Sequence, residues 1–167
     1  MKKSRFDSLT DEQLGWSCME PTFVQMRGKS LSVKAEAIGA LTKGQRALCM
    51  FRVLYDHARH SPEEFYAWLA YLREVKAYGD GVTAGLQFFG DTRMLRIVEE
   101  ATSFIEERNR LLGLTWNDVT VQDVSKDAQL QAAMNESYLH FLEAAEHSHK
   151  LIATYIRSQP HEFVQWQ

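Results

Sequence analysis

The sequence predicts an all-α protein, a single-domain bundle of about six helices around a central helix near residues 42–60. Apolar residues recur at spacings of three and four along most of the chain, and helix-capping residues precede several of these stretches. The chain has 167 residues, the usual length of one domain, and no linker or repeat divides it. We therefore assign residues 1–167 to one helical domain, in which residues 1–40 are the least defined.

The N-terminal forty residues predict short helices. Ser8 or Thr10 can cap a first helix, whose opening turn carries two acidic residues that the helix macrodipole favours. Pro21 is expected to interrupt this helix, because proline lacks the backbone N–H that a helix interior requires. A second short segment follows at Thr22–Arg27, and Val33–Ala40 fits a third.

Residues 42–60 form the strongest predicted helix, because apolar side chains cover more than half of its circumference. A helix with that pattern is usually central in its fold. The sequence Ser61-Pro62-Glu63-Glu64 then signals a new helix, with an N-cap serine, a proline in the first position and two acids. This next helix reaches about Lys76 and carries one apolar stripe.

Glycines punctuate the middle of the chain. Gly79-Asp80-Gly81 is expected to break the preceding helix and to leave a short helical piece at Val82–Phe89. Asp91 or Thr92 can cap a long helix that runs to about Leu112, where a glycine stands in the usual C-terminal position.

One stretch alone differs from this helical pattern. Residues 114–124 have a strand-like composition, but a single strand would lack a partner, so we expect an extended loop. Ser125 or Asp127 can then cap a last helix of about thirty residues that reaches Ser158 and is ended by Pro160.

The charge balance limits the classes of partner. The formal net charge is −3, which argues against direct nucleic-acid binding because such proteins carry a basic excess. Residues 1–60 hold 10 Lys/Arg against 6 Asp/Glu, whereas residues 61–167 hold 9 against 16. The acidic second half fits a basic protein partner, and it equally fits ordinary solvated helix surfaces.

The two cysteines and the N-terminus indicate a cytoplasmic protein. Cys18 and Cys49 lack the spacing of a metal site, and Cys49 lies in an apolar run that predicts a buried, reduced thiol. The basic N-terminus is not followed by the apolar segment of a signal peptide. No apolar run approaches the length of a membrane span, so we expect no membrane association.

Acidic side chains on two predicted helices are candidates for binding a basic partner. On the helix that ends at Leu112, acidic residues share one face, and arginines are interleaved with them at helical spacing. The alternative is therefore an ion-paired surface without a binding role. The candidate partner-binding residues, which include two on the last helix, are Glu99, Glu106, Glu107, Glu136 and Glu143.

The last helix also carries a ladder of Glu and His that suggests a metal site. Glu136, His140, Glu143 and His147 step by four, three and four residues along one face. His140, His147 and Glu143 are the candidate ligands, because this spacing can bring two or three donors to one metal ion. The alternative is a solvated face with i,i+4 pairs, and no cofactor is otherwise indicated. On the same helix His149 lies at the edge of the apolar face.

Aromatic residues near the end of the helix that begins at Pro62 have two interpretations. Trp68, Tyr71 and Tyr78 could form an aromatic recognition patch. Packing in the core explains Trp68 equally well. The sequence alone leaves both interpretations open.

Three short motifs resemble a known family. They are Tyr155-Ile156-Arg157-Ser158-Gln159-Pro160-His161-Glu162-Phe163, Leu41-Thr42-Lys43-Gly44-Gln45-Arg46 and Leu86-Gln87-Phe88-Phe89-Gly90. In this order, over about residues 41–165, they resemble a bacterial all-helical family of unknown function that includes a neisserial DNA-mimic protein. The resemblance implies a compact helical fold, dimerisation and the binding of a protein partner, and it implies no catalysis.

These observations lead to a functional expectation with one principal alternative. We expect a non-enzymatic protein–protein interaction or regulatory module, with a protein partner that is basic and with homodimerisation left open. The alternative is a metal-dependent helical enzyme that uses the Glu/His ladder of the last helix.

Overall fold

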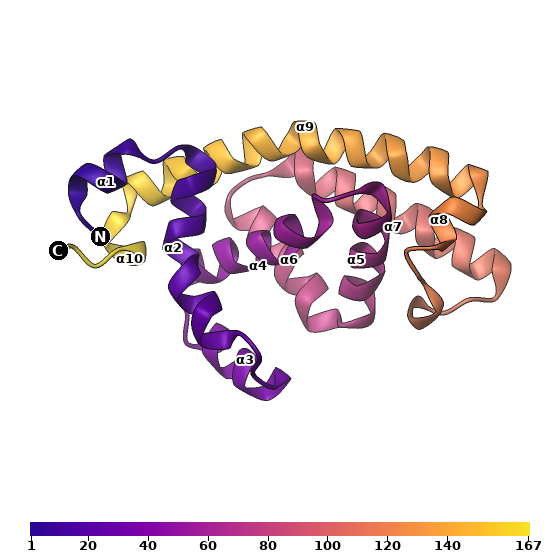
Figure 1. The fold of residues 1–167 in the computed structure, drawn as a ribbon, viewed down its shortest axis with the longest axis horizontal. Helices are drawn as coiled ribbons and strands as arrows, with labels where there is room; N and C mark the ends of the chain where they lie inside the picture. The colour runs from indigo at the N-terminus through magenta and orange to yellow at the C-terminus, as the bar shows by residue number, and fades with distance from the viewer.

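The computed structural model describes all residues 1–167 and is built entirely from helices (Figure 1). Ten α-helices and one short 3₁₀ helix follow one another without a strand. In chain order they are α1 (Lys3–Ser8), α2 (Asp11–Met26), α3 (Leu31–Gly39), α4 (Lys43–Ala58), α5 (Pro62–Glu74), α6 (Lys76–Phe88), α7 (Thr92–Leu112), η1 (Trp116–Asp118), α8 (Asp123–Lys126), α9 (Ala128–Ser158) and α10 (Pro160–Phe163). The all-α prediction is confirmed, but the predicted number of about six helices is too low.

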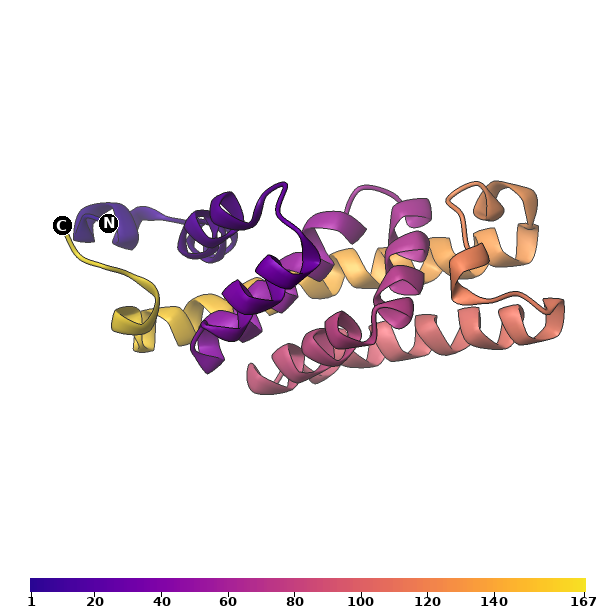
Figure 2. The ribbon, with the colours of Figure 1, turned by 90° about the horizontal axis from the view of Figure 1, so that it is seen from below.

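Helix α9 extends along most of the molecule, and most of the other helices pack against it or against α4 (Figure 1). Its 31 residues make it about 46 Å long at 1.5 Å per residue. Helix α7 runs antiparallel beside it, as both views show (Figures 1 and 2). Helix α4 contacts α2, α5 and α6 and buries ten of its 16 residues. The expected central helix is therefore central, although α9 contacts as many elements.

One hydrophobic core joins the two ends of the chain. Its 32 buried residues extend from Phe6 to Val164. The termini lie side by side, with the Met1 ammonium donating to the Gln165 carbonyl and the Phe6 ring packed edge-on against Trp166 at 5.2 Å between ring centroids (Figure 1). The single continuous core agrees with one compact helical domain.

The predicted caps of the long helices are present. The side chains of Thr10, Ser61, Asp91 and Asp127 each accept a hydrogen bond from a backbone N–H in the first turn of α2, α5, α7 and α9 respectively. Gly113 ends α7 with φ +67°, a left-handed conformation that glycine adopts without strain. These local signals place most helix boundaries within two residues of the prediction.

The prediction that Pro21 interrupts a helix is wrong. Helix α2 runs through Pro21 to Met26 and buries Leu14, Cys18 and Met19 before the expected break and Met26 after it. Proline removes one hydrogen bond from the helix, but packing of α2 against α9 and α4 compensates for that loss.

The expected break at Gly79-Asp80-Gly81 is also wrong, because the chain bends earlier, at Val75, and α6 continues through these residues. Close packing explains the glycines. A Cβ on Gly81 would lie 2.7 Å from the Met50 sulfur, and a Cβ on Gly85 would lie 2.9 Å from the Ala47 carbonyl oxygen. The glycines therefore let α6 lie directly on α4.

Residues 114–124 are not a simple extended loop. They contain η1 and the start of α8, and two side chains organise them. Asp118 accepts hydrogen bonds from the backbone and hydroxyl of Thr115, and Asp123 does the same for Thr120. No helix combines the length and the apolar composition that crossing a membrane requires.

Candidate functional site

A groove of about 770 Å³ lies between the α2–α3 arm and the body formed by α4, α5 and α6. We call it the aromatic groove. Its volume lies within the range of roughly 300–1,000 Å³ that small-molecule sites occupy. Its lining includes the aromatic residues Trp16, Phe23, Trp68, Tyr71 and Tyr78, the apolar residues Met26, Leu31, Ile38 and Val53, and the charged residues Glu12, Arg27, Lys34, Arg52, Asp56 and Arg59.

A row of stacked rings forms one wall of the groove. His57 of α4 stacks on Trp68 of α5 at 3.9 Å between ring centroids, and Trp68 stacks on Tyr71 at 4.7 Å. Tyr78 of α6 continues the row at 6.3 Å from Tyr71. The structure thus brings together all three aromatic residues of the suggested patch, while Trp68 and Tyr78 also contact the core.

The facing side of the groove is built from α2 and a buried arginine of α4. Trp16 and Phe23 lie one above the other with centroids 6.0 Å apart. The guanidinium of Arg52 lies 5.1 Å from the Trp16 ring and 5.5 Å from the Tyr55 ring, within reach of cation–π attraction. Arg52 is only 3% exposed, and Asp56 accepts from its Nε and its Nη2.

Two hydrogen-bond donors of the groove residues lack an acceptor. They are Nη1 of Arg52 and Nε1 of Trp68, and both atoms are buried. A buried donor without a partner costs about 1–3 kcal/mol, and the molecule has further buried unpaired atoms on Asn109 and His149, outside the groove.

Burial shifts the pKa values of Asp56 and His57, two side chains of the groove lining. It raises the pKa of Asp56 above the usual range of a carboxyl, and the opposing attraction of Arg52 only partly offsets this. It lowers the pKa of His57 below the ordinary value of 6.5, so the ring that stacks on Trp68 is neutral at pH 7.

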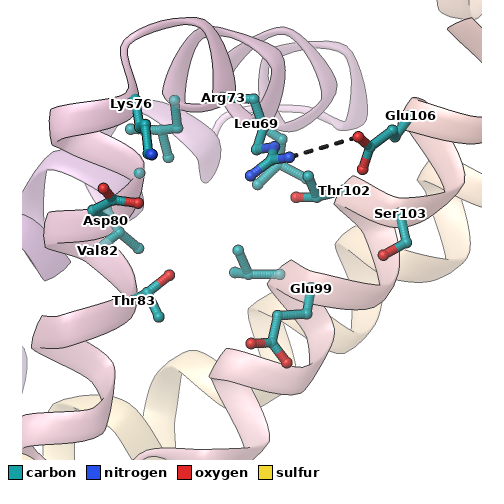
Figure 3. A pocket seen from close by; sticks show the side chains of 13 residues that line it. Leu69, Arg73, Lys76, Asp80, Val82, Thr83, Glu99, Thr102, Ser103 and Glu106 are labelled. Atoms are coloured by element: carbon teal, nitrogen blue, oxygen red, sulfur yellow. Dashed lines mark ion pairs between the residues drawn. The ribbon is translucent and has the colours of Figure 1, made fainter.

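A second, smaller cavity of about 250 Å³ lies between the α5–α6 corner and α7 (Figure 3). Two of the predicted partner-binding residues, Glu99 and Glu106, line it from α7. Arg73 reaches across from α5 and forms an ion pair with Glu106 at 3.6 Å, while Lys76 and Asp80 line the opposite wall. The cavity therefore holds charges of both signs.

The remaining predicted carboxylates lie on the outer surface of α7 and α9, which we call the ion-paired face. Glu107 pairs with Arg110 at 2.6 Å, and Glu143 pairs with Arg93 at 3.3 Å. Hydrogen bonding from Arg110 lowers the pKa of Glu107. Glu136 is exposed and makes no ion pair. The interleaved arginines thus neutralise much of the acidic surface, and partner binding there stays a prediction.

The structure places the three candidate metal ligands on one exposed face of α9 without completing a site. His140 and His147 point to the surface, and Glu143 is engaged by Arg93. Nowhere in residues 1–167 do three or more His, Cys, Asp or Glu side chains converge as a metal site requires.

His149 lies inside the core rather than at its edge. It is 7% exposed and packs edge-on against Tyr55 at 4.6 Å and Phe51 at 5.3 Å. Burial lowers its pKa to about 4. Cys49 is buried as predicted, Cys18 is buried too, and burial raises the pKa of Cys18 to about 11 and of Cys49 to about 12.

The sequence did not reveal the α2 side of the groove. Trp16 and Phe23 are seven residues apart, so they share a face only if the helix continues through Pro21. Arg52, alone among the buried positions of α4 in carrying a charge, was the one local signal. No family model, curated protein or solved structure matches the chain, and the family resemblance of the three motifs stays a prediction.

Proposed function

We propose that the protein is a non-enzymatic binding module and that the aromatic groove is its binding site, which takes a ligand with a flat apolar body. One observation carries this proposal: aromatic rings from α2, α5 and α6 line a single cavity of ligand size. Rings offer large, rigid apolar faces, and a flat ligand between them gains dispersion energy and leaves water.

The nucleophilic side chains of the core support a role in binding rather than catalysis. The thiols of Cys18 and Cys49 stay protonated at neutral pH because their pKa values are raised to about 11 and about 12. Ser148 is fully buried and donates its hydroxyl proton to Asp91. A nucleophile needs a reacting group within reach, and these side chains are enclosed by the core.

The test uses N-phenyl-1-naphthylamine, a neutral two-ring dye whose fluorescence rises when it leaves water. We expect saturable binding of one dye per chain and a loss of about tenfold in affinity in Trp68→Leu, which removes the middle ring of the wall. Trp166→Leu, the same change at a residue outside the groove lining, is the matched control and should bind as the wild type does. Binding that is unaffected by Trp68→Leu would refute the groove as the site.

A basic protein partner is a second proposal, supported by Glu99 and Glu136, which are exposed and make no ion pair. The measurement is affinity capture from native extract at low and high salt, with quantitative mass spectrometry. We expect a near-stoichiometric basic partner that is lost at high salt and lost in the double variant Glu99→Lys/Glu136→Lys. A partner retained by the double variant would contradict this surface, and an empty capture would contradict the protein partner itself.

A further inference from the structure

We infer that the aromatic groove selects an amphipathic anion, whose flat apolar body lies among the rings and whose carboxylate, sulfonate or phosphate lies against Arg27 and Lys34. This inference rests on the proposed function and adds the chemical class of the ligand. Its starting point is the charge that remains after the ion pairs of the groove are counted.

Six charged side chains line the groove, and four of them neutralise one another. Arg52 pairs with Asp56, and Arg59 pairs with Glu12 at 3.2 Å. The last two, Arg27 and Lys34, have no carboxylate partner. The groove therefore carries two uncompensated positive charges, both contributed by the α2–α3 arm.

The two free cations lie at one end of the lining. Arg27 is the residue directly after α2, and Lys34 lies in the first half of α3, so both flank the short connection between these helices. Lys34 is half-buried among the groove residues, and Leu31 and Ile38 of the same helix supply apolar surface beside it. A ligand with one charged end and one apolar body matches this division.

Aromatic walls often bind cations, but one of the rings that line this groove already has a cation over it. The guanidinium of Arg52 lies over the Trp16 ring, and Arg52 and Arg59 both lie near the Tyr55 ring. A cationic ligand would compete with these arginines and be repelled by Arg27 and Lys34. The arrangement thus disfavours a cation and favours an anion.

Two dyes that share a ring system test the inference. 8-Anilinonaphthalene-1-sulfonate carries one negative charge, and N-phenyl-1-naphthylamine is its neutral counterpart. On the wild-type protein at low salt we expect the anionic dye to bind about tenfold more tightly than the neutral dye. Added salt should weaken only the anionic dye, because the Debye length falls to about 3 Å at 1 M.

The variant that decides the question is Arg27→Gln/Lys34→Gln, which removes the two free cations from the surface and leaves the core intact. It should lose the preference for the anionic dye and keep the affinity for the neutral one. Lys126→Gln/Lys150→Gln removes two exposed positive charges outside the groove and should bind both dyes as the wild type does.

The possible results separate the two proposals. If both dyes bind equally well to the wild type, or the double variant keeps the preference for the anionic dye, the inference of an anion is wrong while the groove stands as a binding site. If Trp68→Leu leaves the binding of both dyes unchanged, the groove is not the site and both proposals fail.

Discussion

The aromatic groove and the ion-paired face are both rich in charged side chains, but they use them differently. On the face, Arg110 and Glu107 are 67% and 57% exposed, so water screens their attraction. In the groove, Arg52 is buried between two rings and two further cations have no counter-charge. Many paired charges on exposed helices are therefore typical of a solvated surface. Uncompensated positive charges beside apolar walls, as in the groove, are typical of a binding site.

The largest effect that would distinguish the two regions comes from Arg52. We expect Arg52→Ala to lower the free energy of unfolding by about 3–5 kcal/mol, because Asp56 would keep a mostly buried carboxylate without its partner. Urea unfolding monitored by circular dichroism measures this change. The double variant Arg52→Met/Asp56→Leu should recover most of the loss, and a double variant as unstable as Arg52→Ala would show that packing, not the charge, matters.

A pH titration of stability examines the layer beneath the groove, where Tyr55 separates Arg52 from His149. Unfolded His149 takes up a proton below about pH 6.5, whereas the folded ring stays neutral to about pH 4. Above about pH 6.5 the ring is neutral in both states, and the full free energy of unfolding is present. As the pH falls from about 6.5 to about 4, only the unfolded ring takes up a proton, so the free energy of unfolding decreases by about 3 kcal/mol in total.

The measurement is urea unfolding at several pH values between 4 and 8. His149→Phe should remove this part of the pH dependence, and its stability at pH 8 reports the separate effect on packing. An unchanged slope in the variant would contradict the assignment to His149.

An intermediate effect is expected from the close contact between α6 and α4. Gly85→Ala places a Cβ 2.9 Å from the Ala47 carbonyl and should destabilise the fold by about 1–3 kcal/mol, because α6 must move away from α4. Binding of the neutral dye should weaken as well, since Tyr78 moves with α6. Gly39→Ala, which meets no atom within 4 Å, is the matched control and should be neutral in both measurements.

The smallest effect belongs to the ion-paired face. Glu107→Gln removes the partner of Arg110, yet we expect the urea midpoint to stay within experimental error because both side chains are exposed. The measurement is repeated at low salt, where screening is weakest and any contribution of the ion pair to the free energy of unfolding is largest. A clear destabilisation there would remove the contrast between the two regions.

Local signals predicted the fold better than they predicted the site. Asp127 and Gly113 act within one turn of their own helices, so the sequence was sufficient to place those ends. The predicted helix breaks at Pro21 and Gly81 are wrong because a helix can contain these residues when it packs against residues distant in sequence, such as Met50 beneath α6. The groove was only half predicted for the same reason, since its walls come from helices that meet through tertiary packing.

The position of α9 has a consequence for how the chain folds during synthesis. Helix α2 packs against α9, although more than a hundred residues separate them in sequence. Helix α2, with its buried residues Leu14 and Met19, therefore reaches its final environment only after α9 has left the ribosome. Until then the nascent chain exposes apolar helix faces, which are the kind of surface that chaperones shield.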